Sequence, residues 1–176
     1  MLPNITDYGV TVTIVKGEVK PMEGKIDKAR PFYIIDKVVK EVKDLIADLP
    51  PEKGGALLGT RGSRIITEFI FDSKANTTRS TYNASRNLDQ IVKRKERESG
   101  LEFKGIVHSH PGGMDSPSWT DVNTVEGSLQ TNQHLEFFIA PIVTTNKFST
   151  SLEDHELSLG RNSKISFYGG FKDESQ

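Results

Sequence analysis

The sequence contains no cysteine among its 176 residues. This absence excludes disulfide bonds, thiol nucleophiles and zinc sites built from thiolates. It also excludes a zinc deaminase, whose motif needs a pair of cysteines. Any transition metal would therefore have nitrogen and oxygen ligands, and the lack of cysteine fits a reducing compartment.

Strong net charge and long apolar runs are also missing. The formal net charge is -1, so no overall field would draw the chain to nucleic acid or to an anionic membrane. No stretch approaches the roughly 18 apolar residues that cross a bilayer. The first ten residues lack the basic start and the apolar core of a signal peptide. We therefore expect a cytoplasmic protein with neither a nucleic-acid nor a membrane partner.

Apolar residues make up only 35% of the chain, but they are grouped in periodic runs, which argues against disorder. The length allows one domain with its own core. Strands and helices are expected to interleave, which predicts a mixed α/β fold. We expect residues 1–30 to form an N-terminal strand or hairpin extension, residues 31–170 the main domain and residues 171–176 a flexible tail.

Three helices are predicted from the spacing of apolar residues. The first runs from Asp36 to the prolines at 50 and 51, the second covers residues 87–98, and the third begins at Ser118. The expected buried stripe of the third helix consists of Trp119, Val122, Val125 and Leu129.

The strands are expected at residues 10–14, 32–35, 54–59, 65–71, 103–107, 135–143 and 165–168. Two segments have polar compositions instead. Residues 72–87 are rich in Ser, Thr, Asn and Lys and are expected to form a mobile loop, and residues 144–164 also resemble a loop.

A pair of histidines stands at the end of the strand predicted at 103–107. His108 and His110 are two residues apart, so on a strand both imidazoles would point to the same face. Asp121 falls in the first turn of the third helix, where the positive end of the helix favours a carboxylate. Two imidazoles and one carboxylate leave a fourth position open, which is the arrangement of a catalytic zinc site. We therefore expect one zinc ion per chain.

Each of these features also has a simpler interpretation. Paired histidines on a strand often only fill a surface. Ser118 and Asp121 form the S-x-x-D pattern of a helix capping box, and Glu52 taken alone would be a solvated glutamate. The joint spacing of these residues is what favours a site.

The joint spacing resembles a known family. The segment from His108 to Asp121, HSHPGGMDSPSWTD, is similar to the H-x-H-x7-S-x2-D pattern of the JAMM metalloproteases, the zinc-retaining branch of the MPN domains. Upstream, EKGGALLG from Glu52 to Gly59 resembles the family's glutamate followed by a glycine-rich strand. The resemblance covers roughly residues 32–143. It implies a single MPN-like domain in which a curved mixed β-sheet is flanked by helices.

The resemblance also implies a role for each residue of the motif. His108, His110 and Asp121 would bind zinc, Glu52 would be the general acid/base and Ser118 would stabilise the oxyanion. The implied activity is that of a zinc-dependent isopeptidase, which cleaves after the C-terminus of a ubiquitin-like protein to free a conjugate or process a precursor.

The same resemblance suggests partners. Besides a ubiquitin-like substrate, these are homologues of ubiquitin-activating and ubiquitin-conjugating enzymes, because some prokaryotic relatives work beside them in antiviral operons. Residues 72–87 lie where the family often carries an insertion that grips the substrate.

Two alternatives remain open. A non-catalytic MPN scaffold would have lost a metal ligand or the glutamate, and this chain has lost neither. A RadC-like, DNA-associated protein typically has Asn between the histidines, where this chain has Ser109. Outside the motif, the basic run at 93–97 is expected to be a solvated helix face, and His134 and His155 are expected to be ordinary polar residues.

Overall fold

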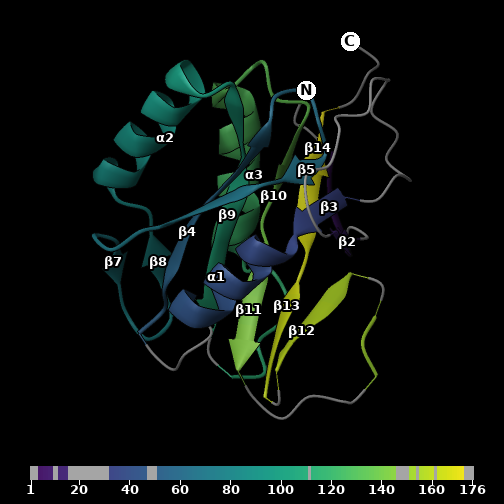
Figure 1. The fold of residues 1–176 in the computed structure, drawn as a ribbon. Coiled ribbons are helices and arrows are strands. Elements are labelled where there is room, and N and C mark those ends of the chain that lie inside the picture. Colours follow the sequence, from purple (N-terminus) through teal and green to yellow (C-terminus); the bar gives the residue numbers. More distant parts are fainter. Residues whose placement is uncertain are drawn as a thin grey trace.

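The computed structural model describes residues 4–9, 12–15, 32–46, 51–110, 112–145, 151–153, 155–160 and 162–172. Its three helices are α1 (Asp36–Ile46), α2 (Arg86–Glu98) and α3 (Trp119–Thr131) (Figure 1). The strands are β1 (Asn4–Gly9), β2 (Val12–Val15), β3 (Phe32–Ile35), β4 (Gly54–Thr60), β5 (Ile65–Ile66), β6 (Glu68–Phe71), β7 (Asn76–Thr77), β8 (Tyr82–Asn83), β9 (Leu101–His110), β10 (Phe137–Ile139), β11 (Ile142–Thr145), β12 (Glu156–Gly160), β13 (Ser163–Ser166) and β14 (Tyr168–Phe171).

The main sheet has nine strands and contains both parallel and antiparallel pairs. Its longest path runs β1-β14-β10-β9-β11-β13-β12, and β4 joins it by pairing with both β6 and β9. Strand β9 is parallel to β10 and β11 and antiparallel to β4. A three-stranded sheet, β2-β3-β5, and the β7-β8 pair complete the strands of the described residues. The mixed α/β fold predicted from the sequence is confirmed.

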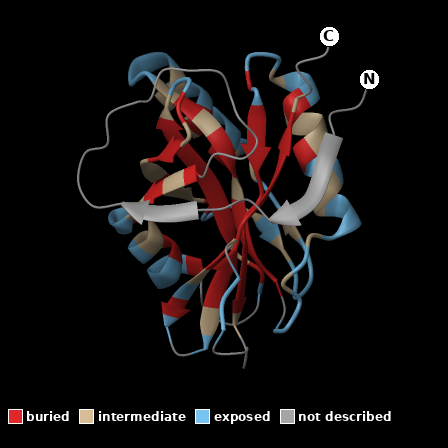
Figure 2. Ribbon diagram, turned by 90° about the vertical axis from the view of Figure 1, so that its right-hand side faces the viewer, coloured by how far each residue is buried: buried red, intermediate tan, exposed pale blue. Residues whose placement is uncertain are grey.

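Helices cover both faces of the main sheet. Leu57 of β4 packs in the cluster that contains the buried face of α1, whereas its neighbours Ala56 and Leu58 pack with α2. On β10, Phe138 packs instead with α3. Because adjacent side chains of a strand point to opposite faces, α1 lies on one face and α2 and α3 lie on the other. Figure 2 shows the buried residues concentrated on the central strands, with exposed residues on the outer sides of the helices.

The crossover from β9 through α3 to β10 determines where polar side chains can meet. Parallel strands need such a connection, and here it returns the chain from the end of β9 to the parallel strand β10 beside it. The C-terminal end of β9 and the N-terminal end of α3 are therefore close together. In open α/β sheets this edge is where ligands commonly bind.

The single strand predicted at 135–143 is in fact two strands. β10 ends at Ile139 and β11 begins at Ile142, and both are parallel to β9. Pro141 lies between them and has no backbone N–H to donate to a ladder. Its carbonyl still accepts a hydrogen bond from the backbone N–H of His108, at 3.2 Å.

The prediction of a loop over 144–164 is wrong in part, because β12 and β13 form an antiparallel pair there. The polar residues of these two strands include two charged side chains that are buried. Glu156 and Lys164 are each less than a tenth exposed and form an ion pair with one another. Charges that pair in this way can occupy strands without an apolar sequence pattern.

Trp119 was expected in the core, but it is 77% exposed. The buried residues of α3 are Val125 and Leu129. At 3.6 residues per turn, steps of three residues drift by about 60°, so Trp119 lies roughly 120° around the helix from Val125. The predicted stripe was thus too long, and its first member faces solvent at the start of α3.

The N-terminal strands pair with distant partners. β1 is antiparallel to β14, and β2 is parallel to β3. β14 ends at Phe171, one residue into the predicted tail, and residues 173–176 lie outside the described residues. In the part of the chain that is described, no helix is long and apolar enough to cross a membrane.

Candidate metal centre

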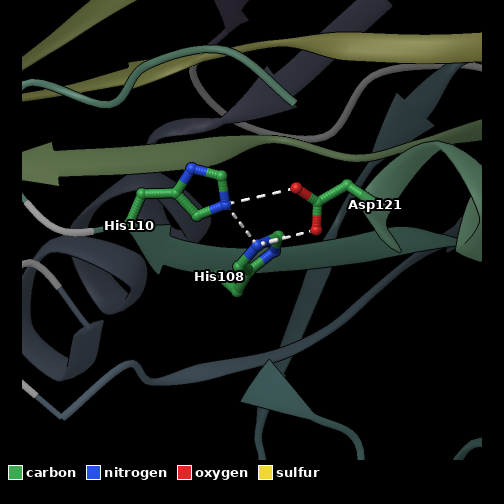
Figure 3. Close-up of side chains that lie close together, drawn as sticks. All are labelled: His108, His110 and Asp121. Atoms are coloured by element: carbon green, nitrogen blue, oxygen red, sulfur yellow. Dashed lines mark hydrogen bonds and ion pairs between the residues drawn. The ribbon is translucent and has the colours of Figure 1, made fainter. Parts of the chain in front are cut away.

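Three side chains converge where the crossover brings the end of β9 close to the start of α3: His108, His110 and Asp121. In Figure 3 both imidazoles, carried on β9, point toward the carboxylate at the start of α3. The ligand atoms of the three residues all lie within 4.8 Å of one another. Both histidines are buried, and Asp121 is partly buried. Among the described residues this is the one such group of His, Cys, Asp or Glu side chains.

The distances within the group suit a tetrahedral ion. The Nε2 atoms of the two histidines are 2.8 Å apart, and they lie 3.1 Å and 3.2 Å from the two carboxylate oxygens of Asp121. Ligands at 2.0–2.1 Å from a tetrahedral zinc ion are roughly 3.3 Å from one another. Two nitrogens and one carboxylate, with no thiolate, also form the donor set of known catalytic zinc sites. The residues therefore fit zinc.

A capping box orients Asp121. Oδ2 of Asp121 accepts hydrogen bonds from the backbone N–H of Ser118 at 2.6 Å and from its hydroxyl at 2.7 Å. In return the hydroxyl of Ser118 accepts from the backbone N–H of Asp121 at 3.3 Å. The capping interpretation and the metal-site interpretation of this S-x-x-D pattern are thus compatible, because the cap directs the carboxylate toward the histidines.

Hydrogen bonding also fixes His110. Its Nδ1 lies 3.0 Å from the carbonyl oxygen of Met114, which can only accept, so Nδ1 carries a proton and Nε2 is directed at the shared centre. Burial would lower the pKa of His110, but its hydrogen bond to Asp121 and the charge of that carboxylate raise it. Burial would raise the pKa of Asp121, yet the hydrogen bonds from His108 and His110 hold it well below its ordinary range.

Glu52 lies beside this group. Its side chain is 5% exposed, and no hydrogen bond to its carboxylate is formed within the described part of the chain. Burial raises the pKa of Glu52 above its ordinary value, against the opposing effect of the two imidazoles. A buried carboxyl group with free acceptor oxygens is suited to proton transfer.

Backbone contacts hold Glu52 in place. The next residue but one, Gly54, is the strand partner of His108. Ser109, between the two histidines, donates its N–H to the carbonyl of Lys53 at 2.8 Å, and its hydroxyl accepts from the N–H of Lys53 at 2.9 Å. The N–H of Glu52 itself donates to the carbonyl of Thr78 at 2.9 Å.

Two adjoining pockets open on the metal-site residues. The smaller, of about 120 Å³, is lined by Glu52, His110, Met114 and Ser118 among others. The larger, of about 220 Å³, has apolar walls that include Ile106 and Phe138. The residues that line both pockets are Tyr82, Asn83, His108, Thr120 and Asp121.

The prediction of a mobile loop over residues 72–87 is wrong in part. The segment contains the β7-β8 pair, and α2 begins at Arg86. Asp72, 5% exposed, accepts hydrogen bonds from the hydroxyl of Tyr82 at 3.1 Å and from the N–H and hydroxyl of Ser85 at 2.7 Å and 2.6 Å. Tyr82 and Asp72 could not be recognised from the sequence, because no local periodicity marks contacts between residues ten or more positions apart.

A buried lysine anchors the segment that leads from His110 to Ser118. The ammonium of Lys164 on β13 donates to the carboxylate of Asp115 at 2.8 Å and to that of Glu156. The hydroxyl of Tyr168 donates to the Asp115 carbonyl at 2.8 Å. The hydrogen bond with Lys164 lowers the pKa of Asp115; burial would raise the pKa of Glu156, but its hydrogen bond with Lys164 lowers that too.

We expect Lys164→Met to lower the free energy of unfolding by about 3 kcal/mol, because it leaves the buried Glu156 carboxylate without its cation. For a chain of this size the fall in Tm would be about 6–12 °C, measured by thermal unfolding at pH 7. Lys93→Met is the matched control. It removes an exposed bridge to Asp89 at 2.8 Å and should change stability by less than about 1 kcal/mol.

The effect of Lys164→Met should depend on pH in a defined direction. Lowered carboxyl pKa values stabilise the fold above the ordinary carboxyl range, and this contribution is lost as the pH falls through the lowered values. The difference between the variant and the wild type should therefore shrink below about pH 4. A difference that is equally large at pH 3 and at pH 7 would contradict the electrostatic explanation.

The remaining polar residues behave as expected from the sequence. His134 is exposed, and His155 contacts Tyr168 and Glu153, so neither belongs to the converging group. In the basic run at 93–97, the first two residues and the last are exposed on α2.

Comparison with known proteins gives one family. A model of the family Prok-JAB, described as prokaryotic homologs of the JAB domain, matches residues 37–153. The match covers about two thirds of the chain and includes all five residues of the predicted site. No curated protein sequence matches the chain.

Proposed function

Because the chain belongs to the prokaryotic JAB family, of the MPN-domain type that its motif resembles, we propose that it is a zinc-dependent peptidase acting on a ubiquitin-like protein. The bond cleaved follows the C-terminus of that protein, either in a lysine conjugate or in a precursor. The proposal rests on one observation. His108, His110 and Asp121 converge on a point beside a buried carboxyl group, that of Glu52.

Each residue of the site has a different role in the proposed reaction. Zinc, bound by His108, His110 and Asp121, would supply Lewis acidity that lowers the pKa of a water to about 7. Glu52 accepts a proton from water in the pocket and returns it to the departing amine, which is otherwise a poor leaving group. Ser118 lines the same pocket, and its hydroxyl turns from Oδ2 of Asp121 to donate its one proton to the oxygen that becomes charged.

The shape of the site supports an extended, narrow substrate segment. The two pockets adjoin between the β7-β8 pair, which contributes Tyr82 and Asn83, and the first turn of α3, which contributes Thr120 and Asp121. A chain end with small side chains fits such a groove. Ubiquitin-like proteins end in such a tail, and a strand edge can hold it by main-chain hydrogen bonds.

Cleavage of a fusion tests the proposal. We expect the purified protein to release a ubiquitin-like domain from a C-terminal extension, a zinc chelator to stop the reaction and added zinc to restore it. Gel electrophoresis and intact-mass measurement would locate the cut after the C-terminus of the domain. A folded, zinc-loaded protein that binds a cognate ubiquitin-like protein without cutting it would contradict the peptidase and favour the scaffold.

A further inference from the structure

Tyr82 lies against one of the two histidines of the metal centre. Its ring is stacked on the imidazole of His108, with centroids 5.7 Å apart and planes inclined by 13°. It belongs to β8, which is far in sequence from β9, and it lines both pockets. The ring is therefore part of the wall of the site and also a neighbour of a metal-binding side chain.

The two histidines are supported differently. The Nδ1 atom of His110 bonds the carbonyl of Met114, which is the usual way to orient a histidine that binds metal. For His108, the polar contacts of the ring with other described residues all involve Nε2, which faces His110 and Asp121. Within the described residues no hydrogen bond reaches its Nδ1. Its ring contacts are an edge contact with His110, which belongs to the same centre, and the stack with Tyr82, which can fix the plane of the imidazole from outside the centre.

The Tyr82 ring is itself held in place. Its hydroxyl donates to the buried carboxylate of Asp72 at 3.1 Å. The same carboxylate binds the N–H and the hydroxyl of Ser85, whose side chain caps α2 by accepting from the N–H of Leu88 at 3.0 Å. Burial and the charge of Asp72 raise the pKa of Tyr82, so the hydroxyl remains a donor. The support of the ring thus extends to the start of a helix.

The hydroxyl end of the ring also packs on β4. A Cβ atom built at Gly54 would lie 2.8 Å from two carbons of the Tyr82 ring and 2.7 Å from the carbonyl oxygen of Val107. The ring therefore occupies the space left by a missing side chain at the strand partner of His108. Close packing of this kind leaves the ring little freedom to turn.

We propose that Tyr82 is the positioning residue for His108: its ring, hydrogen-bonded to Asp72 and packed over Gly54, holds the imidazole in the orientation that binds metal. The stack takes the role that the Met114 carbonyl has for His110. Loss of the ring should weaken metal binding, because His108 must then lose its rotational freedom when the ion binds. This inference rests on the proposed metal centre, and it is independent of whether the protein is a peptidase.

Zinc affinity measured by competition with a chromophoric chelator tests the inference. We expect Tyr82→Leu, which removes the ring, to raise the Kd for zinc by about 10- to 100-fold, the usual effect of losing a group that orients a ligand. Tyr82→Phe keeps the ring and should stay closer to the wild type. Tyr33→Leu, a half-buried tyrosine on β3 outside the site, is the matched control and should leave the Kd unchanged.

Cobalt in place of zinc gives a second measurement, since its visible absorption reports the geometry of its ligands. The spectrum should change in Tyr82→Leu and be restored in Tyr82→Phe. Should Tyr82→Leu fail to fold, Tyr82→Met fills the space over Gly54 without an aromatic ring and is judged by the same criteria. A folded variant without the ring that keeps the wild-type Kd and cobalt spectrum would overturn the inference. A wild-type chain that binds no zinc would overturn the metal centre itself.

Discussion

Glu52→Gln is expected to lower the rate of cleavage by roughly 100- to 10,000-fold, the range typical of lost general acid/base catalysis. Gln is nearly the same size as Glu and can still hydrogen-bond water, but it cannot take up or return a proton. Glu52 is 5% exposed and lines the pocket that His110 and Asp121 also line. A proton carrier in this position is close to both the water and the leaving group.

The variant should separate catalysis from metal binding. Glu52 is outside the group of three converging ligands, so Glu52→Gln should retain about one zinc per chain by elemental analysis. Its fold and its binding of the ubiquitin-like partner should also survive, so the variant would trap that partner. Steady-state kinetics on a fusion substrate, with zinc content measured on the same preparation, gives the comparison.

Glu98→Gln is the matched control, because Glu98 is exposed at the end of α2. The same change of charge there should leave the rate unaltered. If Glu52→Gln instead cleaves at close to the wild-type rate, the mechanism proposed for Glu52 is wrong even if the zinc site is right.

The three converging residues could be predicted because local geometry places them. The spacing of His108 and His110 on a strand, and of Ser118 and Asp121 at a helix start, follows from the backbone of each element alone. The βαβ crossover then brings the two elements together. Glu52 is different. Its place depends on the register of Gly54 with His108 and on the bonds between Lys53 and Ser109, which join segments more than fifty residues apart.

The missed features share a physical cause. β7 and β8 have two residues each, too few for an alternating pattern, and the order around them comes from the single carboxylate of Asp72. Strands β12 and β13 have a polar composition because Lys164 and Glu156 satisfy each other inside the protein. Apolar periodicity detects burial of hydrocarbon, so it cannot detect elements stabilised by buried polar pairs.

Removing a metal ligand should remove the metal. We expect His108→Ala, His110→Ala and Asp121→Asn each to reduce zinc from about one ion per chain to less than about a tenth, because two remaining ligands hold zinc poorly. Asp121→Asn is preferable to alanine at that position. Its amide oxygen can still accept the hydrogen bond from the N–H of Ser118, so the cap of α3 is kept while the charged ligand is lost.

The controls are the two histidines outside the centre. His134→Ala and His155→Ala remove the same ring but should retain the full zinc content, because neither side chain belongs to the converging group. Elemental analysis after purification without chelator measures the metal. Thermal unfolding with and without zinc supplies a second measurement, since an ion that binds only the folded state raises Tm. The ligand variants should lose that increase, and the controls should keep it. Undiminished zinc in both His108→Ala and Asp121→Asn would contradict the site, since it would show that the ion is held elsewhere.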